Sequence, residues 1–133
     1  MAITKGFVDK HRSGGVVTGD LFVGDSAGRT AVIVDDLISS GGTLLRAAKS
    51  VRDHGSRNVI AMVTHGLFMS GALEAVADSA IDRLVVTDCV AAFRIPPDHP
   101  IRGKIDVLPA APLFADAIRR LHEHRDLRDL SVV

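Results

Sequence analysis

Short apolar runs alternate along the chain with segments in which apolar residues recur three and four positions apart. The runs are rich in β-branched residues and are flanked by polar ones, which predicts strands buried on both faces of a sheet. These runs are 31–34, 59–63, 84–86 and 105–108. The segments with helical spacing are 44–51, 73–80 and 114–121. Strands that alternate with helices through short connections predict an α/β fold, an open parallel sheet with flanking helices.

The first thirty residues follow a different pattern. Apolar residues flank Thr18–Gly19–Asp20 on both sides, which predicts an amino-terminal hairpin or flap with its turn at those three residues. The sequence contains no internal repeat, low-complexity tract or linker. We therefore expect residues 1–133 to form a single domain, with the hairpin in residues 1–28 and the α/β core in residues 29–133.

The composition narrows the classes of function. The 133 residues are 47% hydrophobic and 24% charged, which is typical of a folded globular protein. Lysine and arginine total 16, as do aspartate and glutamate, and this zero net charge argues against electrostatic binding to nucleic acid or to a membrane surface. No apolar run has the roughly 18 residues that span a bilayer. We therefore expect neither a nucleic-acid partner nor a membrane partner.

Cysteine and aromatic usage add two further expectations. The single cysteine, Cys89, cannot form an internal disulfide, which suits the reducing cytoplasm. Because Cys89 follows an apolar run, we expect a small core residue rather than a nucleophile. The chain has neither tryptophan nor tyrosine, so a platform on which bases stack is not expected.

The segment that carries chemistry begins where the first apolar run meets two carboxylates. Asp35 and Asp36 are followed by Ser39–Thr43, a loop of small and hydroxyl-bearing residues that begins a helix. In open parallel sheets ligands bind beyond the carboxyl ends of the strands. Converging backbone N–H groups, hydroxyls and the start of a helix favour a phosphate. The carboxylates suit hydrogen bonds from sugar hydroxyls or a magnesium ion held through water.

Each part of this segment also has an ordinary structural explanation. A Gly-Gly-Thr sequence before a helix is usually a turn with a cap, and adjacent acids after a strand are often solvated turn residues. The combination of both is much less common and favours a site. No lysine follows the glycines, so the segment is not a Walker loop, and it lacks the Gly-x-Gly-x-x-Gly spacing of a dinucleotide fingerprint.

Three segments resemble a known family. Residues 34–43 are similar to the phosphoribosyl-diphosphate binding motif of type I phosphoribosyltransferases. Residues 63–72 and 111–120 resemble the carboxyl-terminal half of ribose-phosphate diphosphokinases, and the resemblance runs from about Gly6 to the end. It implies a type I phosphoribosyltransferase-like fold and a cytoplasmic transferase of nucleotide biosynthesis. That enzyme moves diphosphate from MgATP to C1 of ribose 5-phosphate, which gives 5-phosphoribosyl 1-diphosphate.

The resemblance also implies roles for individual residues. Asp35 and Asp36 would hold the ribose hydroxyls and, indirectly, Mg²⁺. Five residues would take the 5-phosphate: Ser39, Ser40, Gly41, Gly42 and Thr43. Synthetases often carry Asp and Thr where this chain has Ser39 and Ser40, so charge beside the phosphate is reduced while one hydroxyl is kept.

Two further sites come from the same resemblance. Asp9–Arg12 is similar to the start of the family's flexible catalytic loop, so Lys10 and Arg12 would stabilise charge on the transferred group. A solvated surface turn is the alternative for this segment. His65 would contact nucleotide or a regulatory phosphate, and a histidine satisfied by backbone is the alternative there.

The family's synthetases are longer and consist of two similar domains. The half that binds adenine and further magnesium ligands has no counterpart in these residues. We therefore expect a homo-oligomer or pairing with a missing amino-terminal half, because a parallel sheet that lacks an edge unit leaves backbone unpaired. Two alternatives to the synthetase remain: a phosphoribosyltransferase acting on a base, and a non-catalytic subunit that binds ribose phosphate for regulation.

Overall fold

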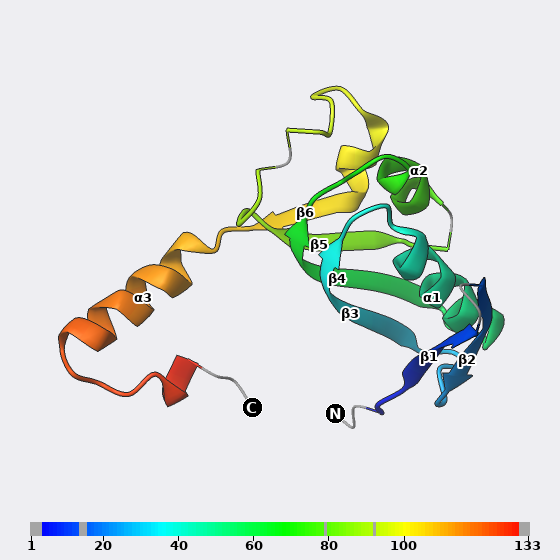
Figure 1. Cartoon of the computed structure of the whole chain (residues 1–133), viewed down its shortest axis with the longest axis horizontal. Coiled ribbons are helices and arrows are strands. Elements are labelled where there is room, and N and C mark those ends of the chain that lie inside the picture. Colours follow the sequence, from blue (N-terminus) through cyan, green and yellow to red (C-terminus); the bar gives the residue numbers. More distant parts are fainter. Residues whose placement is uncertain (1–3, 14–15, 79, 92, 131–133) are drawn as a thin grey trace.

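The computed structural model describes residues 4–13, 16–78, 80–91 and 93–130, with backbone alone for residues 9–13 and 16–21. Its strands are β1 (Phe7–Ser13), β2 (Val16–Val23), β3 (Thr30–Ile38), β4 (Asn58–Gly66), β5 (Arg83–Thr87) and β6 (Ile105–Leu108). Its helices are α1 (Gly42–Asp53), α2 (Ala72–Ala77) and α3 (Ala111–His122), with short 3₁₀ helices η1 (Pro100–Lys104) and η2 (Arg128–Leu130). Figure 1 shows how these elements are arranged.

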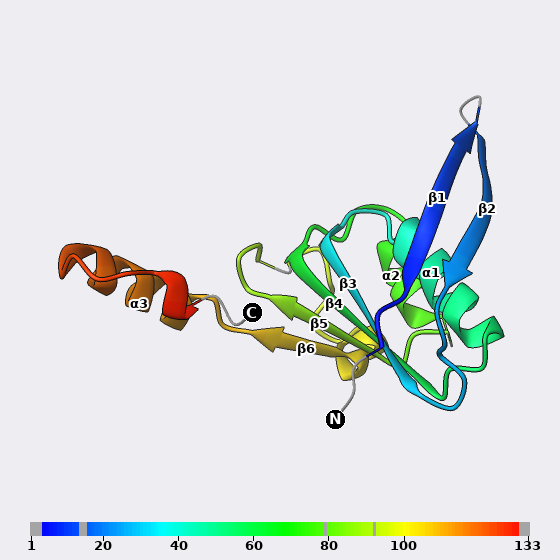
Figure 2. The same cartoon turned by 90° about the horizontal axis from the view of Figure 1, so that it is seen from below.

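The larger sheet has the order β3-β4-β5-β6, and every neighbouring pair is parallel. Helix α1 connects β3 to β4, and α2 connects β4 to β5. Both helices lie on the same face of the sheet (Figures 1 and 2). The predicted α/β fold with an open parallel sheet is therefore confirmed.

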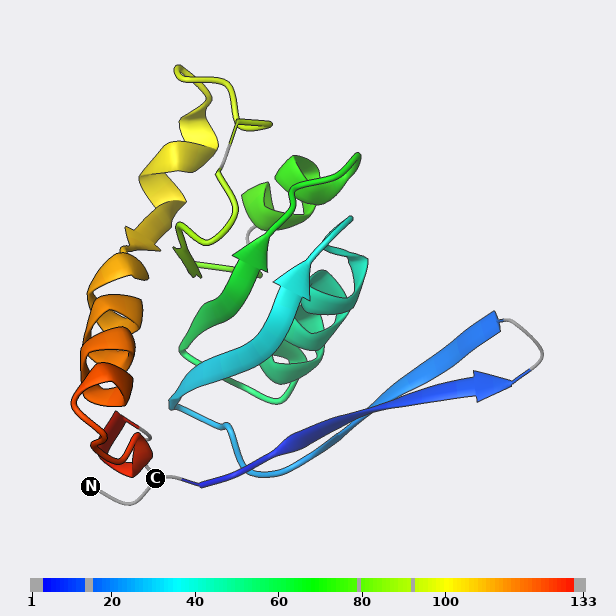
Figure 3. The same cartoon turned by 60° about the vertical axis from the view of Figure 1, so that its left-hand side comes forward.

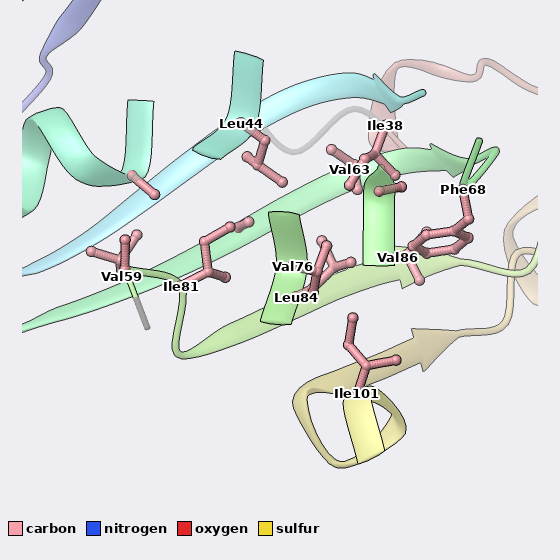
Figure 4. Packing of buried hydrophobic residues seen from close by; sticks show 14 of the residues in the cluster. Ile38, Leu44, Val59, Val63, Phe68, Val76, Ile81, Leu84, Val86 and Ile101 are labelled. Carbon is pink, nitrogen blue, oxygen red and sulfur yellow. The ribbon is translucent and has the colours of Figure 1, made fainter. Parts of the chain in front are cut away.

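The hydrophobic core lies between this face of the sheet and the two helices. Alternate residues of β4 point into it, so that Val59, Ala61 and Val63 are buried while Met62 between them is exposed. Figure 4 shows how the side chains meet. Its labelled members are Ile38, Leu44, Val59, Val63, Phe68, Val76, Ile81, Leu84, Val86 and Ile101.

The opposite face of the sheet is not covered by any helix of the described chain. On β3, Val32 is 51% exposed and Val34 is 77% exposed. The prediction that the strands are buried on both faces is therefore wrong for this face, because α1 and α2 pack on the other one. Exposed apolar side chains continue across β4 and β6 through Met62 and Leu108.

Helix α3 forms as predicted but extends away from the sheet (Figures 1 and 2). None of its residues is buried. Its apolar stripe is exposed along its length: Leu113, Phe114, Ile118 and Leu121. Two hydrogen bonds fix the start of the helix, since Ala110 N donates to Asp88 Oδ1 at 2.8 Å and Asp88 N donates to the Leu108 carbonyl at 3.1 Å.

The amino-terminal hairpin is present, but its turn is not where the sequence predicted. Strands β1 and β2 pair antiparallel from Phe7–Val23 to Ser13–Val16, and both Val17 and Asp20 pair with residues of β1. The predicted turn at Thr18–Gly19–Asp20 is wrong, because these residues lie within β2.

Cys89 differs from its expected position as well. It follows β5 in a turn and is exposed, so the prediction of a buried core cysteine is wrong. The Cys89 N–H donates to Thr87 Oγ1 at 3.2 Å, which closes this turn at the surface. Among the described residues, the longest helices have 12 residues, and none has the length and apolar character needed to cross a bilayer.

Candidate functional site

A polar pocket of about 200 Å³ lies where β3 passes into α1. Ten consecutive residues, Asp35–Leu44, line it. We call this set the cradle. It contains all seven residues that the sequence predicts for the sugar and its phosphate: Asp35, Asp36, Ser39, Ser40, Gly41, Gly42 and Thr43.

The two carboxylates lie within β3, whereas the sequence placed them just after the strand. The parallel ladder continues past them, since Leu37 pairs with His65 and Ile38 with Gly66. Exposure alternates along β3 up to Asp36, so Asp35 is half-buried and Asp36 is exposed. Neighbouring residues of a strand point to opposite sides. The two carboxylates are therefore placed to accept hydrogen bonds from different hydroxyls of one ligand.

The amino-terminal end of α1 supplies donors to the cradle. The first helical bond runs from Leu45 N to the Gly41 carbonyl at 2.9 Å, so the N–H groups of Gly42, Thr43 and Leu44 have no partner within the helix. Gly41 precedes the helix and has no side chain with which to cap these groups. Free amides and the partial positive charge of a helix start together favour an anion.

The two glycines of the cradle are required for different reasons. Gly41 has φ of 78°, and a Cβ there would come within 2.7 Å of the Ala75 Cβ on α2. Packing and backbone conformation therefore both demand glycine at this position. At Gly42 the nearest atoms to such a Cβ are Arg46 Nη1 at 3.5 Å and Ser40 Oγ at 3.9 Å. Packing thus permits a side chain at Gly42, and the space left by its absence opens into the cradle.

The loop after β4 supports the cradle from behind. Leu67 N donates to the Ile38 carbonyl at 3.0 Å, and Met69 N donates to the Ser39 carbonyl at 2.9 Å. Phe68 between them is buried and has φ of 45°, an uncommon conformation for a bulky residue. The sequence did not predict this support. Because it consists of backbone hydrogen bonds, no residue type in the loop indicates it.

The structure does not gather the remaining predicted residues into the cradle. Lys10 and Arg12 lie on β1, where their backbone pairs with β2 and their side chains are outside the described part. The hairpin that carries them extends away from the parallel sheet (Figures 2 and 3). His65 is exposed near the carboxyl end of β4, beside the strand that leads into the cradle, but it does not line the pocket.

A second pocket of about 180 Å³ adjoins the first and shares Asp35 with it. The pocket opens on the uncovered face, where Val34, Met62 and Val85 give it apolar walls. Thr87 Oγ1 donates to the Thr64 carbonyl at 2.7 Å and so joins two of the strand ends that form it. None of its nine lining residues is aromatic, so it lacks a surface on which a base would stack.

The carboxylates of the cradle are candidate ligands for a metal ion. Within the described residues no three side chains of histidine, cysteine, aspartate or glutamate gather as a metal site. Asp35 and Asp36 are nevertheless hard oxygen donors beside a predicted phosphate position. Mg²⁺ usually binds through one or two carboxylates together with substrate phosphates and water, and this donor set fits that mode.

The chain is similar to known proteins over most of its length. The family described as "Phosphoribosyl synthetase-associated domain" matches residues 19–131. The chain is 38% identical over 109 residues to a ribose-phosphate pyrophosphokinase of Hyphomonas neptunium, which covers 81% of this chain and 34% of that protein. It is 42% identical over 101 residues to a ribose-phosphate pyrophosphokinase of Caldanaerobacter subterraneus, and this match covers 76% of this chain and 31% of that protein. The crystal structure of phosphoribosylpyrophosphate synthetase from Mycobacterium smegmatis matches with a TM-score of 0.68 and 32% identity, over 84% of this chain and 38% of that one.

These matches agree with the resemblance seen in the three sequence segments. The chain spans about a third of the length of the curated relatives it matches. The family match includes the cradle and the whole parallel sheet with its helices, and the solved synthetase has a similar fold over 84% of this chain. The chain belongs to the phosphoribosyl synthetase-associated domain family.

Proposed function

We propose that this chain is the ribose 5-phosphate-binding part of a ribose-phosphate diphosphokinase. The enzyme would transfer diphosphate from ATP to C1 of ribose 5-phosphate and supply 5-phosphoribosyl 1-diphosphate for nucleotide biosynthesis. The observation that carries the proposal is the cradle, which combines an uncapped helix start, hydroxyls and two carboxylates in one pocket. The names of the relatives support the same reaction.

Each group of the cradle has a role in this proposal. The N–H groups at the start of α1 and the hydroxyls of Ser39, Ser40 and Thr43 bind the 5-phosphate. Asp35 and Asp36 accept hydrogen bonds from ribose hydroxyls and thereby orient the ring. This binding mode fixes C1 relative to the sheet, and fixing a reacting atom lowers the barrier of a bimolecular transfer.

The transfer itself needs positive charge. The C1 oxygen attacks the β-phosphorus of ATP, the bond from that phosphorus to the α,β-bridging oxygen breaks, and AMP leaves while the hydroxyl proton is lost to solvent or a base. Negative charge spreads over the non-bridging oxygens in the transition state. We assign Lys10 and Arg12 to its stabilisation, with residues 1–28 acting as a catalytic hairpin beside the α/β core of residues 29–133. We assign His65 to contact with nucleotide or a regulatory phosphate.

Mg²⁺ is the cofactor that this reaction implies. Asp35 and Asp36 would hold it indirectly, through water or through the oxygens of the bound sugar and phosphates. When bound, Mg²⁺ neutralises charge on the transferred diphosphate. The two carboxylates also orient the sugar, so their role does not depend on the metal alone.

Partners follow from the uncovered surfaces. Parallel sheets are ordinarily covered on both faces, and contiguous exposed apolar patches mark interaction sites. We propose that the face formed by Val32, Val34, Met62 and Leu108 is covered in a homo-oligomer or by an amino-terminal half that also carries the ATP site. We further propose a cytoplasmic location, which suits a lone exposed Cys89.

The test combines binding with turnover. Titration calorimetry with ribose 5-phosphate measures the cradle, and an assay for AMP formed from MgATP and ribose 5-phosphate measures the reaction. The assay is run with the chain alone and with a synthetase amino-terminal half added. Binding together with AMP formation in either arrangement supports the proposal. Absence of both contradicts it.

Two other results would select the alternatives. Tight binding of ribose 5-phosphate without turnover in either arrangement would identify a non-catalytic binding subunit. Release of diphosphate that depends on an added base would identify a phosphoribosyltransferase, which the absence of aromatic residues around the second pocket disfavours.

A further inference from the structure

The side chains that line the cradle carry no positive charge. The ten lining residues, all within the described part of the chain, include two aspartates and no lysine or arginine. A sugar phosphate brings up to two negative charges of its own, and like charges repel. Backbone amides and the helix start supply only partial charges. A full positive charge close to the phosphate position would therefore contribute strongly to binding.

Arg46 lies one turn into α1 and turns back toward the cradle. Its Nη2 is 3.5 Å from Thr43 Oγ1, and its Nη1 lies 3.5 Å from the position that a Cβ on Gly42 would occupy. This direction is the usual one, because long helical side chains point toward the amino-terminal end of their helix. Both contacts are with residues of the cradle, so the guanidinium lies at its rim.

Lys49, the next cation on the same helix, provides a contrast. Its Nζ lies 3.1 Å from Asp78 Oδ2 at the end of α2, so its charge is directed between the two helices. Lys49 is 54% exposed at its side chain, and Arg46 is also exposed. The guanidinium of Arg46 thus contacts a residue of the cradle, and the ammonium of Lys49 contacts the end of α2.

We propose that Arg46 binds the phosphate of the sugar phosphate, with the guanidinium closing the space that Gly42 leaves open. The inference rests on the proposed function and adds, beside the amides and hydroxyls of the cradle, a charged residue that favours phosphorylated over unphosphorylated sugar. A guanidinium forms two parallel hydrogen bonds with phosphate oxygens, and such charge-assisted bonds are about twice as strong as neutral ones. The contact with Thr43 Oγ1 at 3.5 Å is long for a hydrogen bond, and a phosphate oxygen is a stronger acceptor than a threonine hydroxyl.

Calorimetric titration of three proteins with two ligands tests this. Wild type, Arg46→Gln and the matched control Lys49→Gln are each titrated with ribose 5-phosphate and with ribose. We expect Arg46→Gln to weaken ribose 5-phosphate binding about tenfold and to leave ribose binding unchanged. Lys49→Gln should change neither affinity, and Arg46→Lys should restore part of the loss. Added salt should weaken ribose 5-phosphate binding more in wild type than in Arg46→Gln.

The possible failures are distinguishable. If wild type binds ribose 5-phosphate no better than ribose, the proposed function and the role of Arg46 both fail. If wild type prefers the phosphorylated sugar and Arg46→Gln keeps that preference undiminished, only the role of Arg46 fails. Equal losses for both ligands, or an equal loss in Lys49→Gln, would also overturn it, since a structural or general charge effect would then explain the result. Circular dichroism and thermal melts verify that the variants are folded.

Discussion

The two faces of the parallel sheet are built from alternate residues of the same strands, yet their environments differ. On the covered face Val59, Ala61 and Leu84 have no exposed surface, whereas on the other face Val34 is 77% exposed. Both faces carry apolar residues in the same short runs. An apolar residue in a strand thus predicts a surface that needs to be covered, but it does not predict which element covers that surface.

The cradle lies at the junction of these two environments. Its glycines and the start of α1 belong to the packed side, where α2 and the loop after β4 hold them. Asp36 and the second pocket belong to the uncovered side. The glycines and the helix start of the candidate site are therefore supported by this chain's own core, while the side with Asp36 and the second pocket is open.

The largest expected effect separates the faces directly. Leu84→Ala removes a fully buried side chain from the covered face and should destabilise the fold by about 3–5 kcal/mol. The matched change Leu108→Ala, at a residue 49% exposed on the other face, should cost about 1 kcal/mol or less. Urea unfolding of both variants measures the difference. Equal losses would mean that the second face is packed in solution.

The two cradle glycines give the next largest effect. Gly41→Ala places a Cβ against Ala75 at positive φ and should cost at least about 2 kcal/mol of unfolding free energy. Gly42→Ala should leave stability unchanged or raise it by up to about 1 kcal/mol, as alanine replaces glycine in a helix. We nevertheless expect Gly42→Ala to weaken ribose 5-phosphate binding. Chemical unfolding and calorimetry on each variant separate the two roles, and full affinity in Gly42→Ala would place the ligand elsewhere.

The carboxylates should affect binding without affecting packing. Asp35→Ala or Asp36→Ala should each weaken ribose 5-phosphate binding by roughly 1–3 kcal/mol, the usual loss for a charge-assisted hydrogen bond. Asp53→Ala, at the far end of α1, is the control and should bind like wild type. Calorimetry with ribose itself should show the same loss, because we assign these two carboxylates to the ribose hydroxyls. A loss confined to the phosphorylated ligand would contradict that assignment.

Much of the fold and of the cradle could be predicted from the sequence, and there are physical reasons why the remaining features could not. The strands, the order of helices and the seven cradle residues follow from local periodicity and from one motif. The support of Ser39 by Met69 N–H could not be predicted, because it joins backbone groups thirty residues apart and any side chain permits it. The exposed face could not be predicted either, since Val34 and Val59 are the same residue type in similar runs. The sequence predicts that the strand ends at Asp35 and Asp36, where the apolar run stops, while the ladder to β4 continues past them.

The smallest expected effect concerns α3, which packs against neither face. Hydrogen bonds from Arg120 and Arg119 lower the pKa of the Asp116 carboxyl below its ordinary value of 3.8. Arg120 Nη1 also lies 3.1 Å from the carboxylate of Asp129, which belongs to η2. A carboxyl whose pKa is lower in the folded state stabilises that state above its unfolded pKa and ceases to do so as the pH falls through the folded value. Chemical shifts should therefore show α3 losing helicity as the pH falls below about 3.8, while α1, held by the core, keeps its own. Asp116→Asn should reduce the helicity of α3 at neutral pH and remove most of this pH dependence, and Asp98→Asn, outside α3, should do neither. Loss of α1 and α3 together would show that α3 is coupled to the packed face after all.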